Sequence, residues 1–324
     1  MLQFFRENRI FNYVFVLIYL IGIRLFTFFE AYGPLVDQDS AAFYLIGEIN
    51  GLSPWLYKSI SILLLFYHIA YINRLVGINK LAIGNSLFPG IFYILLISIF
   101  PDIHPLSSVL IGNTFLIIAI FNLFQIIHRN QRSKRMFNTG FFICLAGFCN
   151  IEFLWFFPFF ILAANSLVAI KNKDILLYVI GLMLPIYFVL SYLLLKGELT
   201  EFFQDFILQL KYFKYPFVFA NYGIVKVGCL GLLTLFIFIS FNNLVNRTNI
   251  FVRNKLNFIF YVLTFGWIVF ALAGSVTLQD TMVLTIPLSI LLGTYFLQIN
   301  RHNISESFHF LLLLIALMFQ YFLV

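Results

Sequence analysis

The stretch EAYGPLVDQDSAAFYLIGEINGLSPWLYK, residues 30–58, interrupts an otherwise very apolar N-terminal half. Its glycines and prolines break regular structure, and it contains aromatic residues as well as acids. The long apolar segments on both sides predict membrane spans, so we interpret the stretch as an acidic, partly helical loop between two spans. Lys58 is its only cation, and its acids are Glu30, Asp37, Asp39 and Glu48.

Composition extends this interpretation to the whole chain. Of 324 residues, 62% are hydrophobic and only 10% are charged, whereas a soluble protein is typically ~25% charged. The apolar runs are long and continuous, which is typical of membrane helices and not of barrel strands. We therefore expect an all-α, polytopic membrane protein that forms a single integral membrane domain over residues 1–324.

The net charge of +7 bears on the partners of the protein. Most of the cations fall in short segments between apolar runs, as the positive-inside rule predicts for a membrane protein. We therefore expect the lipid bilayer as a partner, and no nucleic acid. The three cysteines, Cys144, Cys149 and Cys229, all lie within apolar segments and form neither a metal-ligand pattern nor a disulfide framework.

A helix that crosses the hydrocarbon needs ~20 residues, and this length predicts about eleven spans, within a range of about nine to twelve. The segment 136–170 is too long for one span and short for two, so we expect a hairpin of two short helices with Glu152 near its tip. The other predicted spans cover about residues 11–29, 59–76, 81–100, 109–127, 175–195, 222–241, 257–274, 281–299 and 308–324.

The loop charges predict the orientation. The segment HRNQRSKR, residues 128–135, is the strongest cytoplasmic marker, and basic loops alternate with acidic ones along the chain. This alternation predicts a cytoplasmic N-terminus and an outer C-terminus. Within the outer regions, KGELTEFFQDFILQLKYFKYP, residues 196–216, has apolar residues at helical spacing. It predicts an amphipathic helix that lies in the membrane interface.

Several ionisable residues fall at the predicted outer boundary. Charged groups at this depth are costly unless they are paired or face water, which favours a functional role. The alternative is that loop acids only solvate helix ends, with Glu152 reaching water from its hairpin. The candidates are Asp37, Asp39, Asp102, His104, Glu152 and Asp280.

Three cations complete the candidate set. Arg24 lies inside the first predicted span, where it either extends to the interface, pairs with Asp37 or Asp39, or binds an anionic head group. Lys211 and Lys214 belong to the basic and aromatic cluster KYFKYP. Lysine binds phosphate as a point charge, but the same cluster is also typical of an interfacial anchor.

The acidic stretch resembles the first outer loop of the GT-C class of polyprenyl-phosphate-sugar-dependent glycosyltransferases. In VDQDSAAFYLIGEINGLSP, the acidic pair Asp37 and Asp39 precedes an aromatic, two glycines and a proline. The segments GFFICLAGFCNIEFLWFFPFFILAA and LQDTMVLTIPLSILLG resemble the central hairpin and the late outer segment of that class. The chain departs from the class at Glu152, where a lysine is usual, and at Thr281 and Met282, where Arg-Tyr is frequent.

This resemblance implies a GT-C-like arrangement and a polyprenyl-phosphate-linked sugar donor. Asp37 or Asp39 would act as general base or hold a divalent cation on the phosphate. A lysine or arginine at the outer boundary would stabilise the leaving phosphate. The implied substrate-binding residues are Arg24, Asp102, His104, Glu152, Lys211, Lys214 and Asp280.

A second resemblance concerns three apolar segments of the chain. The segments FFRENRIFNYVFVLIYL, FPDIHPLSSVLIGNTFLIIAIFNLF and RSKRMFNTGFFICLAGFCNIEFLWFFPFFI resemble an uncharacterised family of bacterial multi-pass inner-membrane proteins. It implies the bacterial inner membrane, with the outer loops in the periplasm. Two further function classes stay open beside the glycosyltransferase: a non-catalytic subunit of a secretion, motility or glycan-export assembly, with membrane-protein partners, and a transporter.

Overall fold

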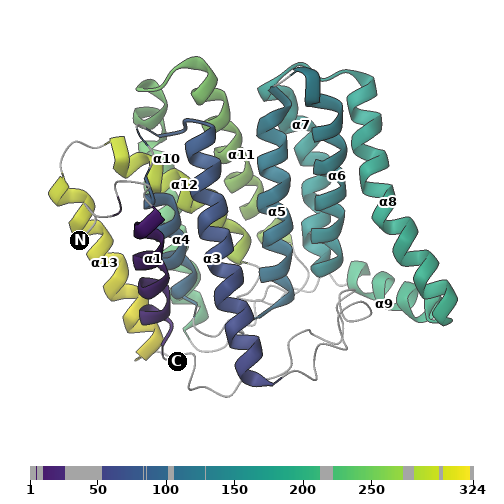
Figure 1. The fold of residues 1–324 in the computed structure, drawn as a ribbon, viewed down its shortest axis with the longest axis horizontal. Helices are drawn as coiled ribbons and strands as arrows, with labels where there is room; N and C mark the ends of the chain where they lie inside the picture. The colour runs from purple at the N-terminus through teal and green to yellow at the C-terminus, as the bar shows by residue number, and fades with distance from the viewer. Residues whose placement is uncertain are drawn as a thin grey trace.

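The computed structural model is an all-helical bundle (Figure 1). The residues that it describes contain helices and no strand, which confirms the prediction of an all-α protein. The described residues are 5, 10–25, 53–82, 84, 86–100, 106–127, 129–211, 222–272, 281–298 and 302–321.

The helices of the described residues fall into two length classes. The shorter apolar helices include α1 (Ile10–Ile23), α4 (Phe88–Ser98), α7 (Phe156–Leu167) and α12 (Met282–Gln298). The six that are long and apolar enough to cross a membrane identify a multi-pass membrane protein. They are α3 (Pro54–Ile78), α5 (Ser108–Phe124), α8 (Asn172–Lys196), α10 (Gly223–Asn246), α11 (Ile250–Leu272) and α13 (His302–Tyr321).

Helix α4 forms the centre of the bundle. All of its 11 residues are buried, and Gly293 of α12 packs against Pro89 at its start. Its length is about 16 Å at 1.5 Å per residue, roughly half of a ~30 Å hydrocarbon core. The span predicted over residues 81–100 is therefore much shorter as a helix.

The described residues between α3 and α4 are non-helical, and Leu81, Ser86 and Leu87 among them are buried. Lys80 and Gly84 have positive φ angles of 50° and 83°, which end α3 and prevent an immediate helical restart. The Leu87 amide donates to the carbonyl oxygen of Phe5 at 2.9 Å, and the Ser86 hydroxyl accepts from the Phe88 amide at 3.0 Å. Non-helical backbone at membrane depth is tolerated only when other parts of the protein satisfy its polar groups in this way.

Helices α6 (Arg132–Cys149) and α8 pack against each other at a close junction of backbones. A Cβ atom at Gly140 would collide with the carbonyl oxygen of Tyr178, and one at Gly181 would collide with that of Phe137. Each glycine thus lies against the backbone of the opposite helix. Small residues permit such close approach in membrane bundles, where no hydrophobic effect drives helix association.

The segment 136–170 bends between α6 and α7. Helix α6 ends at Cys149, and a short 3₁₀ helix, η6 (Ile151–Trp155), leads into α7. The side chain of Asn150 caps this turn by accepting a hydrogen bond from the Glu152 amide at 2.9 Å. Glu152 therefore lies in the turn between the two helices.

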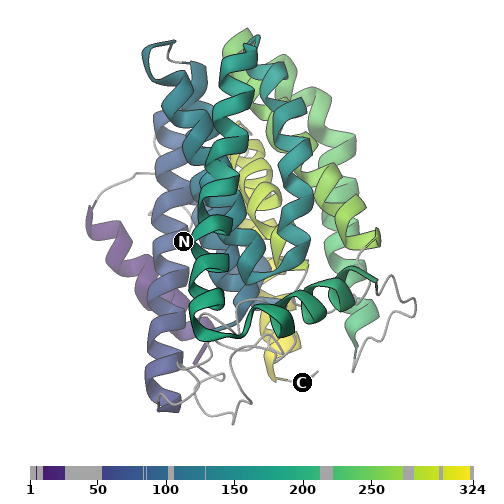
Figure 2. The same cartoon turned by 90° about the vertical axis from the view of Figure 1, so that its right-hand side faces the viewer.

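The chain turns sharply at the end of α8. Gly197 has a φ of 79°, and the Glu198 amide donates to the carbonyl oxygen of Leu193 at 3.1 Å, which closes the helix end. Helix α9 (Leu199–Lys211) then runs crosswise to the bundle (Figure 2). It lies within the predicted segment 196–216, of which residues 212–216 fall outside the described residues.

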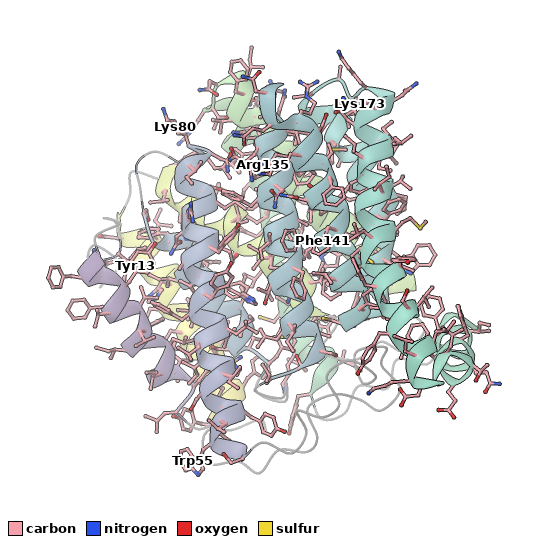
Figure 3. All side chains as sticks on the ribbon, turned by 45° about the vertical axis from the view of Figure 1, so that its right-hand side comes forward. Tyr13, Trp55, Lys80, Arg135, Phe141 and Lys173 are labelled. Carbon is pink, nitrogen blue, oxygen red and sulfur yellow. The ribbon has the colours of Figure 1, made fainter. Side chains whose placement is uncertain are left out.

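The two ends of the bundle differ in charge. Figure 3 shows Lys80, Arg135 and Lys173 toward one end, which we call the basic end, and Trp55 at the opposite end. Arg247 also contacts the last residue of α12 there, with its guanidinium 3.4 Å from the carbonyl oxygen of Gln298. Several loops that the sequence predicts to be cytoplasmic thus share one end.

Candidate functional site

The residues predicted to carry chemistry are described only in part. Arg24 and Glu152 have described side chains, and Lys211 is the last residue of α9, with a side chain that is not described. The other predicted site residues lie outside the described residues: Asp37, Asp39, Asp102, His104, Lys214 and Asp280.

Arg24 follows the last turn of α1 and turns into the bundle, where only 5% of it is exposed. Its Nη2 atom lies 3.5 Å from the carbonyl oxygen of Ile97, near the end of α4. The last carbonyls of a helix have no partner within the helix and carry partial negative charge. Arg24 therefore places its cation against the C-terminal end of α4.

A second buried cation lies on α10. Lys226 is 0% exposed, and its ammonium lies 5.9 Å from the ring centroid of Phe319 on α13. The neighbouring residue Gln320 donates from its amide nitrogen to the carbonyl oxygen of Ser98 at 3.2 Å. Lys226 thus lies against α13, the helix whose Gln320 bonds the same end of α4 that Arg24 reaches.

Arg24, Ser98, Lys226 and Gln320 form what we call the α4-end cluster. Two cations in the interior of a membrane protein are expensive and mark functional positions by default. Three residues of the cluster also lie near predicted outer loops in the sequence. Arg24 precedes the stretch 30–58, Ser98 precedes the loop 101–105, and Lys226 follows the segment 212–221.

Lys226 was not among the residues singled out from sequence. It lies close to the start of an apolar run, where it does not lower the hydropathy enough to interrupt a predicted span. An inspection for single ionisable residues within spans would have found it, as it found Arg24.

Glu152 belongs to a different set of contacts. The next residue, Phe153, packs its ring on Gly112 of α5, and Leu154 packs on Gly147 of α6. These contacts fix the turn between α6 and α7 against its neighbours. The described contacts of this turn do not bring Glu152 to the α4-end cluster.

A hydrogen-bonded chain of side chains crosses the centre of the bundle. His68 of α3 is fully buried; its Nδ1 lies 2.7 Å from the Tyr93 hydroxyl of α4 and its Nε2 lies 2.7 Å from the Thr114 hydroxyl of α5. Because Thr114 donates its own proton to the carbonyl oxygen of Leu110, it accepts from His68 Nε2–H, and Tyr93 donates to Nδ1. Both ring nitrogens are used, so we assign His68 a structural role that joins α3, α4 and α5.

The prediction of a divalent cation concerned Asp37 and Asp39. Within the described ranges, no group of three or more His, Cys, Asp and Glu side chains could hold a metal ion. Because both aspartates lie outside those ranges, the cation stays a prediction for them alone.

The α4-end cluster thus combines two buried cations with two buried polar side chains. No protein-family model matches this chain, and no curated protein or solved structure matches it. The comparisons therefore assign no family, and the function has to be inferred from the chemistry of the residues themselves.

Proposed function

We propose that this protein is a GT-C-like membrane glycosyltransferase that uses a polyprenyl-phosphate-linked sugar at the periplasmic face of the inner membrane. The observation that supports it best is the burial of two cations, Arg24 and Lys226, around the end of α4. A buried cation suits a lipid-linked phosphate, because a phosphate that leaves the sugar gains negative charge in a medium of low dielectric constant.

The proposed reaction transfers the sugar to an acceptor hydroxyl. The acceptor oxygen attacks the anomeric carbon, the bond between that carbon and the phosphate oxygen breaks, and the lipid phosphate leaves with the electron pair. Asp37 or Asp39 takes the acceptor proton or holds a divalent cation on the phosphate. The implied substrate contacts at Asp102, His104, Glu152, Lys211, Lys214 and Asp280 belong to the same proposal.

The orientation is also part of the proposal. About eleven spans with a cytoplasmic N-terminus place the basic end in the cytoplasm and the α4-end cluster toward the periplasm. Cysteines substituted at Asp39, Asp102 and Asp280 should then react with a membrane-impermeant thiol reagent in intact cells, and cysteines at Arg132 and Arg253 should not. Labelling at Arg132 from outside would reverse the orientation and remove the periplasmic site.

The catalytic test replaces both aspartates in the chromosomal copy of the gene. Asp37→Asn with Asp39→Asn keeps the side-chain shapes and should abolish transfer of the sugar to the envelope glycan, because a general base contributes ~10²–10⁴-fold in rate. Glu48→Gln is the matched control and should keep wild-type glycan. The measurement is mass spectrometry of envelope glycans at equal protein levels in the membrane.

The same experiment distinguishes the alternative. A double variant that is stable and transfers sugar normally would overturn the catalytic proposal in favour of the non-catalytic assembly subunit. Lys226→Met tests the phosphate contact, because Met fills a similar volume without the charge. It should lower the transfer at least tenfold, whereas Lys196→Met at the exposed end of α8 should leave it unchanged.

A further inference from the structure

A second group of cations lies toward the basic end, away from the α4-end cluster. It occupies the junction of α3, α5 and α6 and consists of Tyr71, Arg74, Phe121, Asn122 and Arg135, which we call the α3–α5 site. Arg135 is labelled beside α3 and α5 in Figure 3, a short distance inside the basic end. Anionic lipid head groups lie at the cytoplasmic surface of a membrane, which is the surface nearest to this site when the basic end faces the cytoplasm.

The side chains of the site hold one another in place. Arg135 donates from Nη1 to the Oδ1 atom of Asn122 at 2.9 Å and from Nη2 to the Oε1 atom of Gln131 at 3.1 Å. Asn122 in turn donates to the carbonyl oxygen of Ile118 at 2.9 Å. The Arg135 guanidinium is therefore positioned in advance, while its buried Nε has no hydrogen-bond partner among the described residues.

Arg74 approaches the same place from α3. Its guanidinium carbon lies 5.9 Å from the centroid of the Phe121 ring, and the Tyr71 ring lies 5.2 Å from the same ring. Arg74 and Tyr71 therefore both lie against the Phe121 ring, and the next residue of α5, Asn122, holds the guanidinium of Arg135.

The charge of this position is not neutralised by the neighbouring side chains. None of the contacts that Arg74 and Arg135 make with the described residues is to a carboxylate. Arg74 is exposed, and Tyr71, Phe121 and Arg135 are partly exposed, so the site opens at the outer surface of the bundle. A ligand would therefore reach it from the bilayer side or from the adjoining water.

We propose that the α3–α5 site binds the phosphate of an anionic phospholipid of the bilayer. Guanidinium groups bind phosphate oxygens through paired, charge-assisted hydrogen bonds, and the Tyr71 hydroxyl can donate a further one. The aromatic rings of Tyr71 and Phe121 offer an apolar wall for the glycerol and the first acyl carbons. Basic pockets between membrane helices on the cytoplasmic side bind anionic head groups in this manner.

The test measures lipid binding to the purified full-length protein in neutral detergent. Phosphatidylglycerol should bind and raise the unfolding temperature, whereas phosphatidylcholine should bind at least tenfold more weakly. Arg74→Gln should weaken phosphatidylglycerol binding roughly tenfold, which corresponds to the loss of one charged hydrogen-bond partner. Arg135→Lys keeps the positive charge but loses the paired N–H donors of the planar guanidinium, and should weaken phosphatidylglycerol binding by a similar factor.

Two control variants each remove one positive charge, as Arg74→Gln does. Lys80→Gln and Lys134→Gln remove exposed cations of the basic end that lie outside the site, and each should change binding less than twofold. Equal weakening by the controls would overturn the proposal in favour of general electrostatic attraction. Inorganic phosphate at millimolar concentration should not displace phosphatidylglycerol from the protein. If it displaces the lipid as effectively as unlabelled phosphatidylglycerol does, the lipid assignment is overturned and the site binds free phosphate.

Discussion

The α6–α8 junction and the surroundings of α4 show two ways to hold helices together without water. At the junction, Gly140 and Gly181 bring two backbones into contact, so that packing alone supplies most of the attraction. Around α4, hydrogen bonds from side chains of other helices add to the packing. Asn73 accepts from the Gly90 amide at 2.9 Å near the start of α4, and Arg24 and Gln320 reach the carbonyls of its last turn.

The difference between these two regions follows from the lengths of helices α8 and α4. Helix α8 has 25 residues, so its unpaired terminal groups and the break at Pro185, which has no amide proton, are a small share of its backbone. Helix α4 has 11 residues, so its unpaired terminal amides and carbonyls make up a large share of its backbone. A short helix inside a membrane protein therefore depends on polar partners as well as on packing, and a long helix depends mainly on packing.

The largest effect should come from a methyl group at the glycine junction. Gly140→Ala places a Cβ against the carbonyl oxygen of Tyr178, where only a shift of the backbone can relieve the clash. We expect a loss of about 3 kcal/mol in the free energy of unfolding, at the upper end for overpacking. Gly228→Ala on α10 is the control, because a Cβ there meets nothing within 4 Å. Equal unfolding temperatures for the two variants would contradict the role of the junction.

The next effect should come from the hydrogen-bonded chain at α4. His68→Leu leaves the Tyr93 and Thr114 hydroxyls without their partner, and should cost about 2 kcal/mol. If the chain acts as a unit, His68→Leu combined with Tyr93→Phe should cost less than the sum of the single variants. A double-mutant cycle of reversible unfolding in detergent measures the coupling, which we expect near 1 kcal/mol. Strict additivity would show that the two helices are held by packing alone.

A smaller effect should come from the polar contact of the α6–α8 junction. The Ser133 hydroxyl donates to the buried carboxylate of Asp174 at 2.9 Å, at the start of α8. Ser133→Ala should therefore destabilise the protein by about 1 kcal/mol. Ser191→Ala removes a hydroxyl that bonds only within its own helix, and it should be nearly silent. A loss as large as that of Gly140→Ala would mean that polar contacts, not packing, dominate this junction as well.

The smallest change in stability should come from α9, which has exposed apolar residues. Phe203 is exposed there beside the polar Gln204. Phe203→Asp should shift the unfolding temperature little but reduce the burial of α9 in lipid, whereas Gln204→Asp should do neither. Fluorescence of a probe on α9 in lipid nanodiscs, quenched by brominated lipid, measures this contact. Identical quenching in both variants would argue against an interfacial helix.

The sequence predicts the long helices because continuous apolar runs of sufficient length have few alternatives in a membrane. It overestimates the span at 81–100, because hydropathy cannot distinguish backbone that crosses lipid from backbone buried in protein. Gly84 and Pro89 are the signals that mark this break. Helix α11 starts at Ile250, before the predicted residue 257, and its first turns include Lys255, which donates to the Oδ1 atom of Asn79 at the end of α3.

The candidate site was predictable to a smaller extent. Arg24 stands out in sequence because an arginine interrupts an apolar run, but its contact with Ile97 on α4 joins residues far apart in the chain. Such pairings depend on how helices pack, which periodicity and hydropathy do not encode. His68 is a similar case, because its neighbours in sequence say nothing about the hydroxyls of Tyr93 and Thr114.

The shortness of α4 has a consequence for the biogenesis of the protein. An 11-residue segment is too short to be inserted by the translocon as an ordinary span. Helix α12, which packs along it, begins only at Met282, so synthesis at ~5–20 residues per second leaves α4 without this partner for roughly 10–40 s. During that time Asn73 and Arg24, which are synthesised earlier, can bond the two ends of α4, but the face that α12 later covers has no partner. The central helix of the bundle should therefore be among the last to reach its final place.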